Sequence, residues 1–125
     1  RSLAQQRPDH DEPAPTNLKV LPKNTSGEDV HRIMKVFSKS LGVRCTHCHF
    51  SQPQEGSPYP KFDFASDAKT EKTVARQMMM MTDSINKNFI SKIGQEAGFE
   101  NITCVTCHMG NVKPMVSIDS LPKKN

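Results

Sequence analysis

All four cysteines of the 125-residue sequence occur in two pairs, and a histidine directly follows each pair. Residues 45–49 read Cys-Thr-His-Cys-His, and residues 104–108 read Cys-Val-Thr-Cys-His. The spacing Cys-x-x-Cys-His is typical of the attachment site of a c-type haem. Residues i, i+3 and i+4 share one face of a helical turn, so both thiols can reach the two vinyl groups of a porphyrin while the imidazole faces its iron. The sequence therefore predicts two haem c groups, each covalently held through thioethers.

The two motifs assign six residues to haem binding. The expected thioether-forming residues are Cys45, Cys48, Cys104 and Cys107, and the expected proximal iron ligands are His49 and His108. Only five of the 125 residues are His. On composition alone, a His directly after both pairs has a chance of roughly one in several hundred, so the pattern is specific.

Three other uses of paired cysteines fit less well. A disulfide within Cys-x-x-Cys closes a very small loop and stabilises little, and longer-range disulfides would leave the two histidines unexplained. A four-Cys zinc site usually has its pairs about 15 to 20 residues apart, whereas a much longer stretch separates Cys48 from Cys104. A thioredoxin-type pair requires a preceding strand, and neither motif follows a strand-like run.

The ligand on the opposite face of each iron decides what the site does. A second protein ligand closes the iron for electron transfer, whereas an open face permits ligand binding or peroxide chemistry. Two segments share the pattern Val-x-Arg-x-Met, ending at Met34 and Met78, and each precedes one attachment motif. We therefore predict Met34 and Met78 as distal ligands, although a methionine stripe more often packs a core. Met81, one turn after Met78, is the strongest alternative for the second haem, and Met115 is the next.

The arginines of the same repeat, Arg32 and Arg76, are candidates for binding the haem propionates. A guanidinium group matches a carboxylate with two parallel hydrogen bonds. A solvated position on the helix surface is the alternative for both residues.

The methionines are expected to lie on two helices. Ser26, with Asp29 three residues later, resembles a capping box, and apolar residues then recur at helical spacing until Gly42. A second apolar stripe runs over residues 74–93, in a helix that should begin near Thr70 and end at Gly94. Residues 50–66 contain three prolines and no apolar period, which predicts a loop.

The overall composition favours a small helical domain around its cofactors. We expect an extended Pro-rich arm over residues 1–24, a dihaem cytochrome c domain over residues 25–115 and an extended tail over residues 116–125. The hydrophobic fraction is 34% with no Trp, so side chains alone would make a thin core that two porphyrins could complete. The predicted fold class is mainly α: a small multihaem cytochrome c with two helix-plus-CxxCH units and little or no sheet.

The charge pattern argues against a nucleic-acid partner, and the hydropathy argues against a transmembrane segment. The net charge of +4 comes from Lys and Arg residues scattered among acids, without the interleaved aromatic pattern of a nucleic-acid interface. No run of about 18 apolar residues is present, so no transmembrane segment is expected.

Around the two motifs and the two predicted helices, the chain resembles the cytochrome subunit of photosynthetic reaction centres and smaller cytochromes built from the same repeat. The resemblance covers residues 17–114. It rests on residues 17–22, on residues 32–34 before the first motif, on residues 74–88, and on residues 103–108. In that family the distal ligand is a Met on the helix before each attachment site, which implies Met34 and Met78. The family subunit carries four haems, whereas this chain has motifs for two. In the family, one haem has two His ligands, and one of them comes from the helix equivalent to residues 70–93, which contains no His in this chain.

The expected function is electron transfer through closed, six-coordinate haems, without enzymatic activity. The resemblance implies a periplasmic or extracellular location, because covalent haem attachment takes place outside the cytoplasm. Expected partners are redox proteins, copies of this chain or a larger membrane-associated complex. One alternative is a subunit of a polymeric electron conduit, in which the N-terminal arm docks on a neighbour and His10 or His31 ligates a haem. Another is a haem enzyme or gas sensor with one open axial position.

Overall fold

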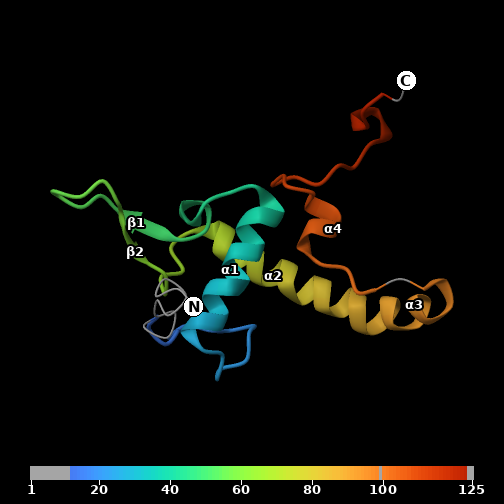
Figure 1. Cartoon of the computed structure of the whole chain (residues 1–125), viewed down its shortest axis with the longest axis horizontal. Coiled ribbons are helices and arrows are strands. Elements are labelled where there is room, and N and C mark those ends of the chain that lie inside the picture. Colours follow the sequence, from blue (N-terminus) through green and yellow to red (C-terminus); the bar gives the residue numbers. More distant parts are fainter. Residues whose placement is uncertain (1–11, 99, 124–125) are drawn as a thin grey trace, which may run out of the picture.

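A computed structural model describes residues 12–98 and 100–123 of the chain. Its helices are α1 (Gly27–Leu41), α2 (Thr70–Ile85), α3 (Ser91–Ala97) and α4 (Cys104–His108), with a π-helical segment η4 (Asn86–Ile90) and short 3₁₀ turns η3 (Cys45–His47) and η5 (Ile118–Ser120). Strands β1 (Phe50–Gln52) and β2 (Lys61–Asp63) form one antiparallel pair (Figure 1). This largely helical structure with one small sheet agrees with the predicted mainly α class. His10 and most of the predicted arm lie outside the described residues.

Helix α1 begins and ends where its capping residues predict. The Ser26 side chain accepts a hydrogen bond from the Asp29 backbone N–H, which satisfies a free donor of the first turn. Glu28 and Asp29 place negative charge at the N-terminal end of the helix dipole. Gly42 adopts the left-handed conformation (φ 69°) that ends the helix.

The second helix is longer than its sequence pattern predicted. We expected it to end at Gly94, but α2, η4 and α3 form one continuous rod that ends at Gly98 (Figure 1). Gly98 has φ 76° and donates its N–H to the Gly94 carbonyl, so it is the residue that stops the helix. Glycine inside a helix costs only about 1 kcal/mol relative to alanine, so the helix can continue through Gly94.

The predicted loop over residues 50–66 contains a short hairpin. Phe50 pairs with Asp63 and Gln52 with Lys61, and the connection between them passes through Gly56 at φ 75°. The ring of Phe62, in β2, stacks on that of Phe64, which follows the strand, with centroids 4.9 Å apart. The prolines of this segment lie between the strands, so the sequence pattern hid two strands of only three residues each.

The end of α1 and the turn after α4 meet at close range. The Gly110 N–H donates to the Ser40 carbonyl at 2.8 Å, and Ser40 is the one buried residue in the described part of the chain, at 4% exposure. A Cβ atom on Gly42 would lie 2.2 Å from the Gly110 carbonyl oxygen. This contact holds the second attachment motif beside α1 and leaves no room for a side chain at position 42.

Gly42→Ala is therefore expected to lower the free energy of unfolding by roughly 3 kcal/mol or more, because left-handed strain and a backbone clash add together. Gly56→Ala is the matched control, since Gly56 has a similar φ of 75° but a Cβ atom there would meet no other atom within 4 Å. The control should lose only about 1–2 kcal/mol from strain. Chemical denaturation of the haem-loaded protein measures both losses, and equal losses would show that the clash is absent.

Asn86 ties the long helical rod to the segment that enters α4. Its side-chain Nδ2 donates to the Ile102 carbonyl at 3.0 Å, and the Ile102 N–H donates to Asn86 Oδ1 at 2.8 Å. One side chain thus satisfies both backbone groups of Ile102 in a partly buried position. The second attachment motif is therefore anchored both to η4 and to α1.

Asn86→Ala is expected to destabilise the protein by about 1–3 kcal/mol, because two partly buried backbone groups lose their partner. The matched control is Asn88→Ala on the same segment, whose exposed Nδ2 makes one bond to Ser84 Oγ. Thermal unfolding of both variants compares the losses. A loss for Asn88→Ala as large as that for Asn86→Ala would contradict the anchoring role.

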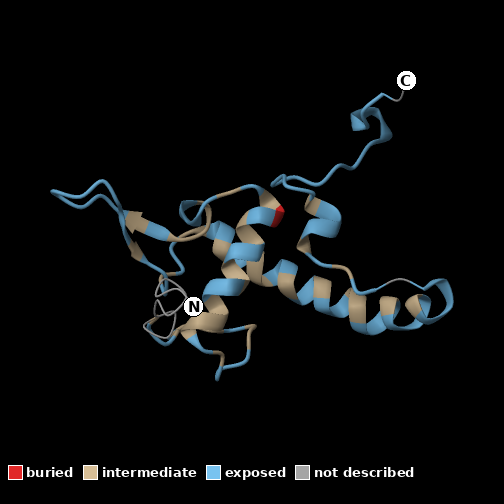
Figure 2. Ribbon diagram, viewed as in Figure 1, coloured by how far each residue is buried: buried red, intermediate tan, exposed pale blue. Residues whose placement is uncertain are grey.

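The described residues form no closed apolar core. None of their hydrophobic side chains is buried, and Figure 2 shows exposed and half-exposed surface along nearly the whole ribbon. The apolar stripe of the long rod is open to solvent, with Val74 at 43%, Phe89 at 59% and Ile93 at 47% exposure. In the described part of the chain, no helix combines the length and apolar character needed to cross a bilayer.

Candidate functional site

The first motif folds into the helical turn that its spacing predicts. The Cys48 and His49 backbone N–H groups both donate to the Cys45 carbonyl, at 3.3 and 2.9 Å. Burial raises the pKa of the Cys48 thiol, and the Glu71 carboxylate adds to this rise. The Lys69 ammonium group, at the start of α2, donates to the Thr46 carbonyl inside the motif.

The second motif is helix α4, and it has a capping box. Thr103 and Thr106 cap each other, and the Thr103 N–H donates to Thr106 Oγ1 at 2.9 Å. Burial raises the pKa of the Cys104 thiol. All four cysteines are free thiols, so neither of the disulfide arrangements is present.

His108 is oriented by a backbone carbonyl. After α4, Met109 (φ 51°) and Gly110 (φ 86°) take left-handed conformations and turn the chain back. This turn brings the Asn111 carbonyl oxygen to 2.9 Å from His108 Nδ1. A carbonyl only accepts, so Nδ1 carries the proton, and Nε2 is left with a free lone pair for a metal.

His49 lies in a different environment. Its ring meets the Phe64 ring edge-on, with centroids 5.1 Å apart, and its buried Nδ1 has no hydrogen bond of standard geometry. Burial lowers the pKa of the His49 imidazole, and the positive charges of Lys72 and Arg76 lower it as well. A contact with the Phe64 backbone raises this pKa, but by less than the other causes lower it. The neutral imidazole that results is the form that binds a metal.

The predicted distal methionines lie on the two long helices. Met34 is half-buried on α1, while on α2 Met78 is 42% and Met81 49% exposed. Met115, in the segment after α4, is 48% exposed. Their roles as iron ligands stay predictions, as do those of the two proximal histidines.

The two predicted propionate-binding arginines already have carboxylate partners. Arg32 is 62% exposed and pairs with Glu28 at 3.2 Å and with Asp29 on its own helix. The Arg76 side chain is only 15% exposed, and it donates to Asp67 Oδ1 and to the Asn17 carbonyl, each at 2.9 Å. Contacts from either guanidinium to a propionate stay predictions.

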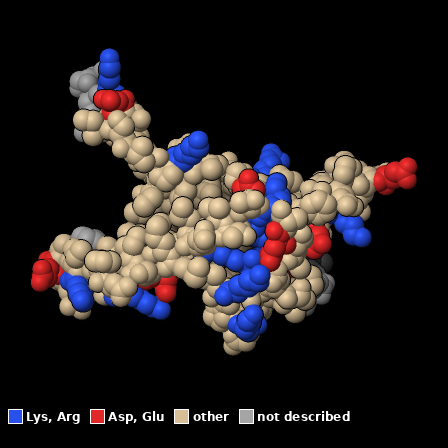
Figure 3. Space-filling view, turned by 180° about the vertical axis from the view of Figure 1, so that it is seen from behind, with Lys and Arg blue, Asp and Glu red and all other residues tan. Residues whose placement is uncertain are grey.

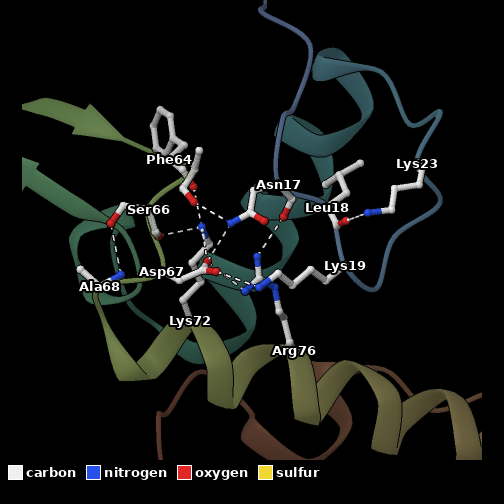
Figure 4. Close-up of polar contacts among 11 residues, drawn as sticks. Asn17, Leu18, Lys19, Lys23, Phe64, Ser66, Asp67, Ala68, Lys72 and Arg76 are labelled. Atoms are coloured by element: carbon white, nitrogen blue, oxygen red, sulfur yellow. Dashed lines mark hydrogen bonds and ion pairs between the residues drawn. The ribbon is translucent and has the colours of Figure 1, made fainter.

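Arg76 belongs to a cluster of charges that the sequence pattern did not reveal. Asp67 accepts hydrogen bonds from Lys19 and Arg76 and pairs with Lys72 at 3.2 Å (Figure 4). Bonds from Lys19 first, and then from Asn17, hold the pKa of the Asp67 carboxyl well below its ordinary value. We call Lys19, Lys72 and Arg76 with Asp67 the basic cluster. On the face of the molecule drawn in Figure 3, Lys and Arg side chains are interspersed with acidic ones.

The residues present fit a covalently bound porphyrin. Two pairs of free thiols each share a helical turn with an imidazole, and the Nδ1–H bond of His108 to a carbonyl leaves its Nε2 free for a metal. Open apolar surface along α2 could be covered by a flat apolar group. Among the described residues, no three His, Cys, Asp or Glu side chains come together to hold a metal ion.

Comparisons with known proteins agree with this chemistry. Residues 50–121 match the family described as photosynthetic reaction centre cytochrome C subunit. The photosynthetic reaction center cytochrome c subunit of Rubrivivax gelatinosus is 28% identical over 120 residues, covering 80% of this chain and 31% of the relative. Cytochrome c-554 of Chloroflexus aurantiacus is 29% identical over 96 residues, covering 77% of this chain and 20% of the relative.

A third relative is the photosynthetic reaction center cytochrome c subunit of Roseobacter denitrificans, 28% identical over 100 residues, covering 78% of this chain and 24% of the relative. This chain therefore spans less than a third of the length of each of these relatives. No solved structure gives a significant match.

Proposed function

The chain belongs to the family of photosynthetic reaction centre cytochrome c subunits, and on that premise we propose that it transfers electrons through two covalently bound c-type haems. One observation carries the proposal. Each Cys-x-x-Cys-His motif folds into a single helical turn, and the four thiols of the two motifs are all free. Family membership supports haem c as the cofactor, and the presence of two motifs supports the number two.

Each residue of the site has a proposed role. The thiols of Cys45 and Cys48 would hold one porphyrin and those of Cys104 and Cys107 would hold a second one, so that neither cofactor could dissociate. His49 and His108 would bind the irons through Nε2. When bound, haem iron supplies a one-electron couple between its ferric and ferrous states.

The distal side is closed by methionine sulfur in this proposal. Met34 and Met78 are the candidates, with Met81 as the alternative for Met78. A protein ligand on this side keeps small molecules and peroxide off the metal, and thioether ligation favours a positive reduction potential. Each iron would then gain or lose one electron, and no side chain would need to move a proton.

Location and partners follow from the same proposal. The protein would act outside the cytoplasm and exchange electrons with redox proteins, with copies of itself or with a larger membrane-associated complex. Residues 25–115 would form the dihaem domain, between an extended arm (residues 1–24) and an extended tail (residues 116–125).

Visible and near-infrared spectra of the haem-loaded protein test the closed sites. We expect low-spin spectra in both oxidation states, a charge-transfer band typical of Met ligation in the oxidised protein, and no change on adding carbon monoxide. Met34→Ala and Met78→Ala should each open one site to carbon monoxide, and Met80→Ala, at an exposed position of α2, is the control. Carbon monoxide binding by the unaltered protein would favour a gas sensor or enzyme instead.

A further inference from the structure

The two proximal histidines differ in their hydrogen bonding. His108 Nδ1 donates to the Asn111 carbonyl at 2.9 Å. His49 Nδ1 is buried, and its contact with the Phe64 backbone, which raises the pKa of the imidazole, does not have the geometry of a standard hydrogen bond. A strong bond from Nδ1–H to a carbonyl makes an imidazole a more electron-donating ligand, and this stabilises the oxidised metal. The His108 site therefore favours the ferric state more than the His49 site does.

Positive charge beside the first site acts in the same direction. The Lys72 ammonium donates to the carbonyls of Phe64 and Ser66 at 2.7 and 2.8 Å, and the Phe64 ring packs against His49. Lys72 and Arg76 side chains are only 11% and 15% exposed, so water screens their charges weakly.

Two carboxylates near the first site oppose these cations but do not cancel them. Asp67 contributes one negative charge against the three positive charges of Lys19, Lys72 and Arg76. Glu71 acts on Cys48, where the Lys69 ammonium opposes it. The basic cluster thus keeps a net positive charge beside His49. Reduction adds one electron to the metal, so nearby positive charge stabilises the reduced state.

We propose that the haem held by His49 has the higher reduction potential, because Lys72 and Arg76 stabilise its ferrous state, so that an electron shared between the two haems rests on the first. This inference rests on the proposed function. It assigns Lys72 and Arg76 as tuning residues that act on the metal through the surroundings of His49. In the half-reduced protein, the iron at His49 is ferrous and the iron at His108 is ferric.

The gap between the two potentials of the haem-loaded protein, followed by spectroelectrochemical titration, tests this. Lys72→Met should change the equilibrium constant for electron transfer between the two haems by about tenfold. For a one-electron couple this narrows the gap by about 59 mV. Lys19→Met, at a side chain that is 56% exposed, should narrow it less. Asp67→Asn should widen it, because it removes the opposing negative charge.

Lys87→Met is the matched control, since it removes one positive charge from the same helical rod at a 73% exposed side chain paired with Asp83. It should leave the gap unchanged. A gap that widens in Lys72→Met, or that responds equally to Lys72→Met and Lys87→Met, overturns the inference. Haem content measured on the same samples separates this outcome from failure of the proposed function, in which no covalent haem is found at all.

Discussion

Replacing Cys104 and Cys107 together by alanine is expected to halve the haem content of the purified protein. Without the two thiols no thioether can form at α4, and a haem held there by His108 alone would be extracted on denaturation. The first motif is a separate helical turn with its own free thiols, so its haem should remain. Mass spectrometry and absorbance of the denatured protein count the haems per chain.

The reciprocal variant, with Cys45 and Cys48 replaced by alanine, is the matched comparison and should also retain one haem. Met109→Ala changes an exposed residue beside the second motif without touching a thiol, and it should retain both. Full haem content in either double-cysteine variant would mean that the altered motif does not attach a haem.

A haem-free form of the chain is expected to lack a cooperative unfolding transition. No hydrophobic side chain among the described residues is buried, so burial of apolar surface by protein atoms alone contributes little. An isolated helix of the length of α1, 15 residues, is marginal in water. Two porphyrins would supply the apolar surface that the helices otherwise leave open.

The comparison requires the same chain with and without haem, the latter produced without the attachment machinery. Far-UV circular dichroism during heating should show a sigmoidal transition only for the haem-loaded form. If the haem-free chain unfolded cooperatively at a similar temperature, the protein would have a sufficient core of its own and the cofactors would not be needed for folding.

The parts of the structure that sequence could predict are the local ones. Capping at Ser26 and Gly42 depends on neighbouring residues, and so does the helical turn of each Cys-x-x-Cys-His motif. The stop at Gly94 was wrong because glycine permits a helix end without requiring one. Gly98, four residues later, takes the left-handed conformation instead.

The contacts that surround the site are long-range, and no local pattern marks them. Arg76 meets Asn17, 59 residues away, and the Asn86 side chain reaches Ile102, 16 residues away. Asp67 lies in a segment without periodicity, so its role as acceptor for three cations had no signal in the sequence. Asn17, Arg76 and Asn86 do fall inside the segments that resemble the reaction-centre family, which was the only pointer to them.

The arrangement of the two units also depends on these contacts. The start of α2 touches the first motif through Lys69 and Thr46, while the end of α1 touches the turn after the second motif through Ser40 and Gly110. Each methionine-bearing helix thus contacts an attachment motif that is not the next one after it in the chain. The two units are therefore joined by contacts that cross between them.

The intact mass of the denatured natural protein tests the central claim most directly. We predict the mass of the polypeptide plus two haem groups, with the red colour remaining on the chain after acid and organic extraction. A mass equal to that of the bare polypeptide would contradict covalent attachment at both motifs, and with it the proposed electron-transfer function.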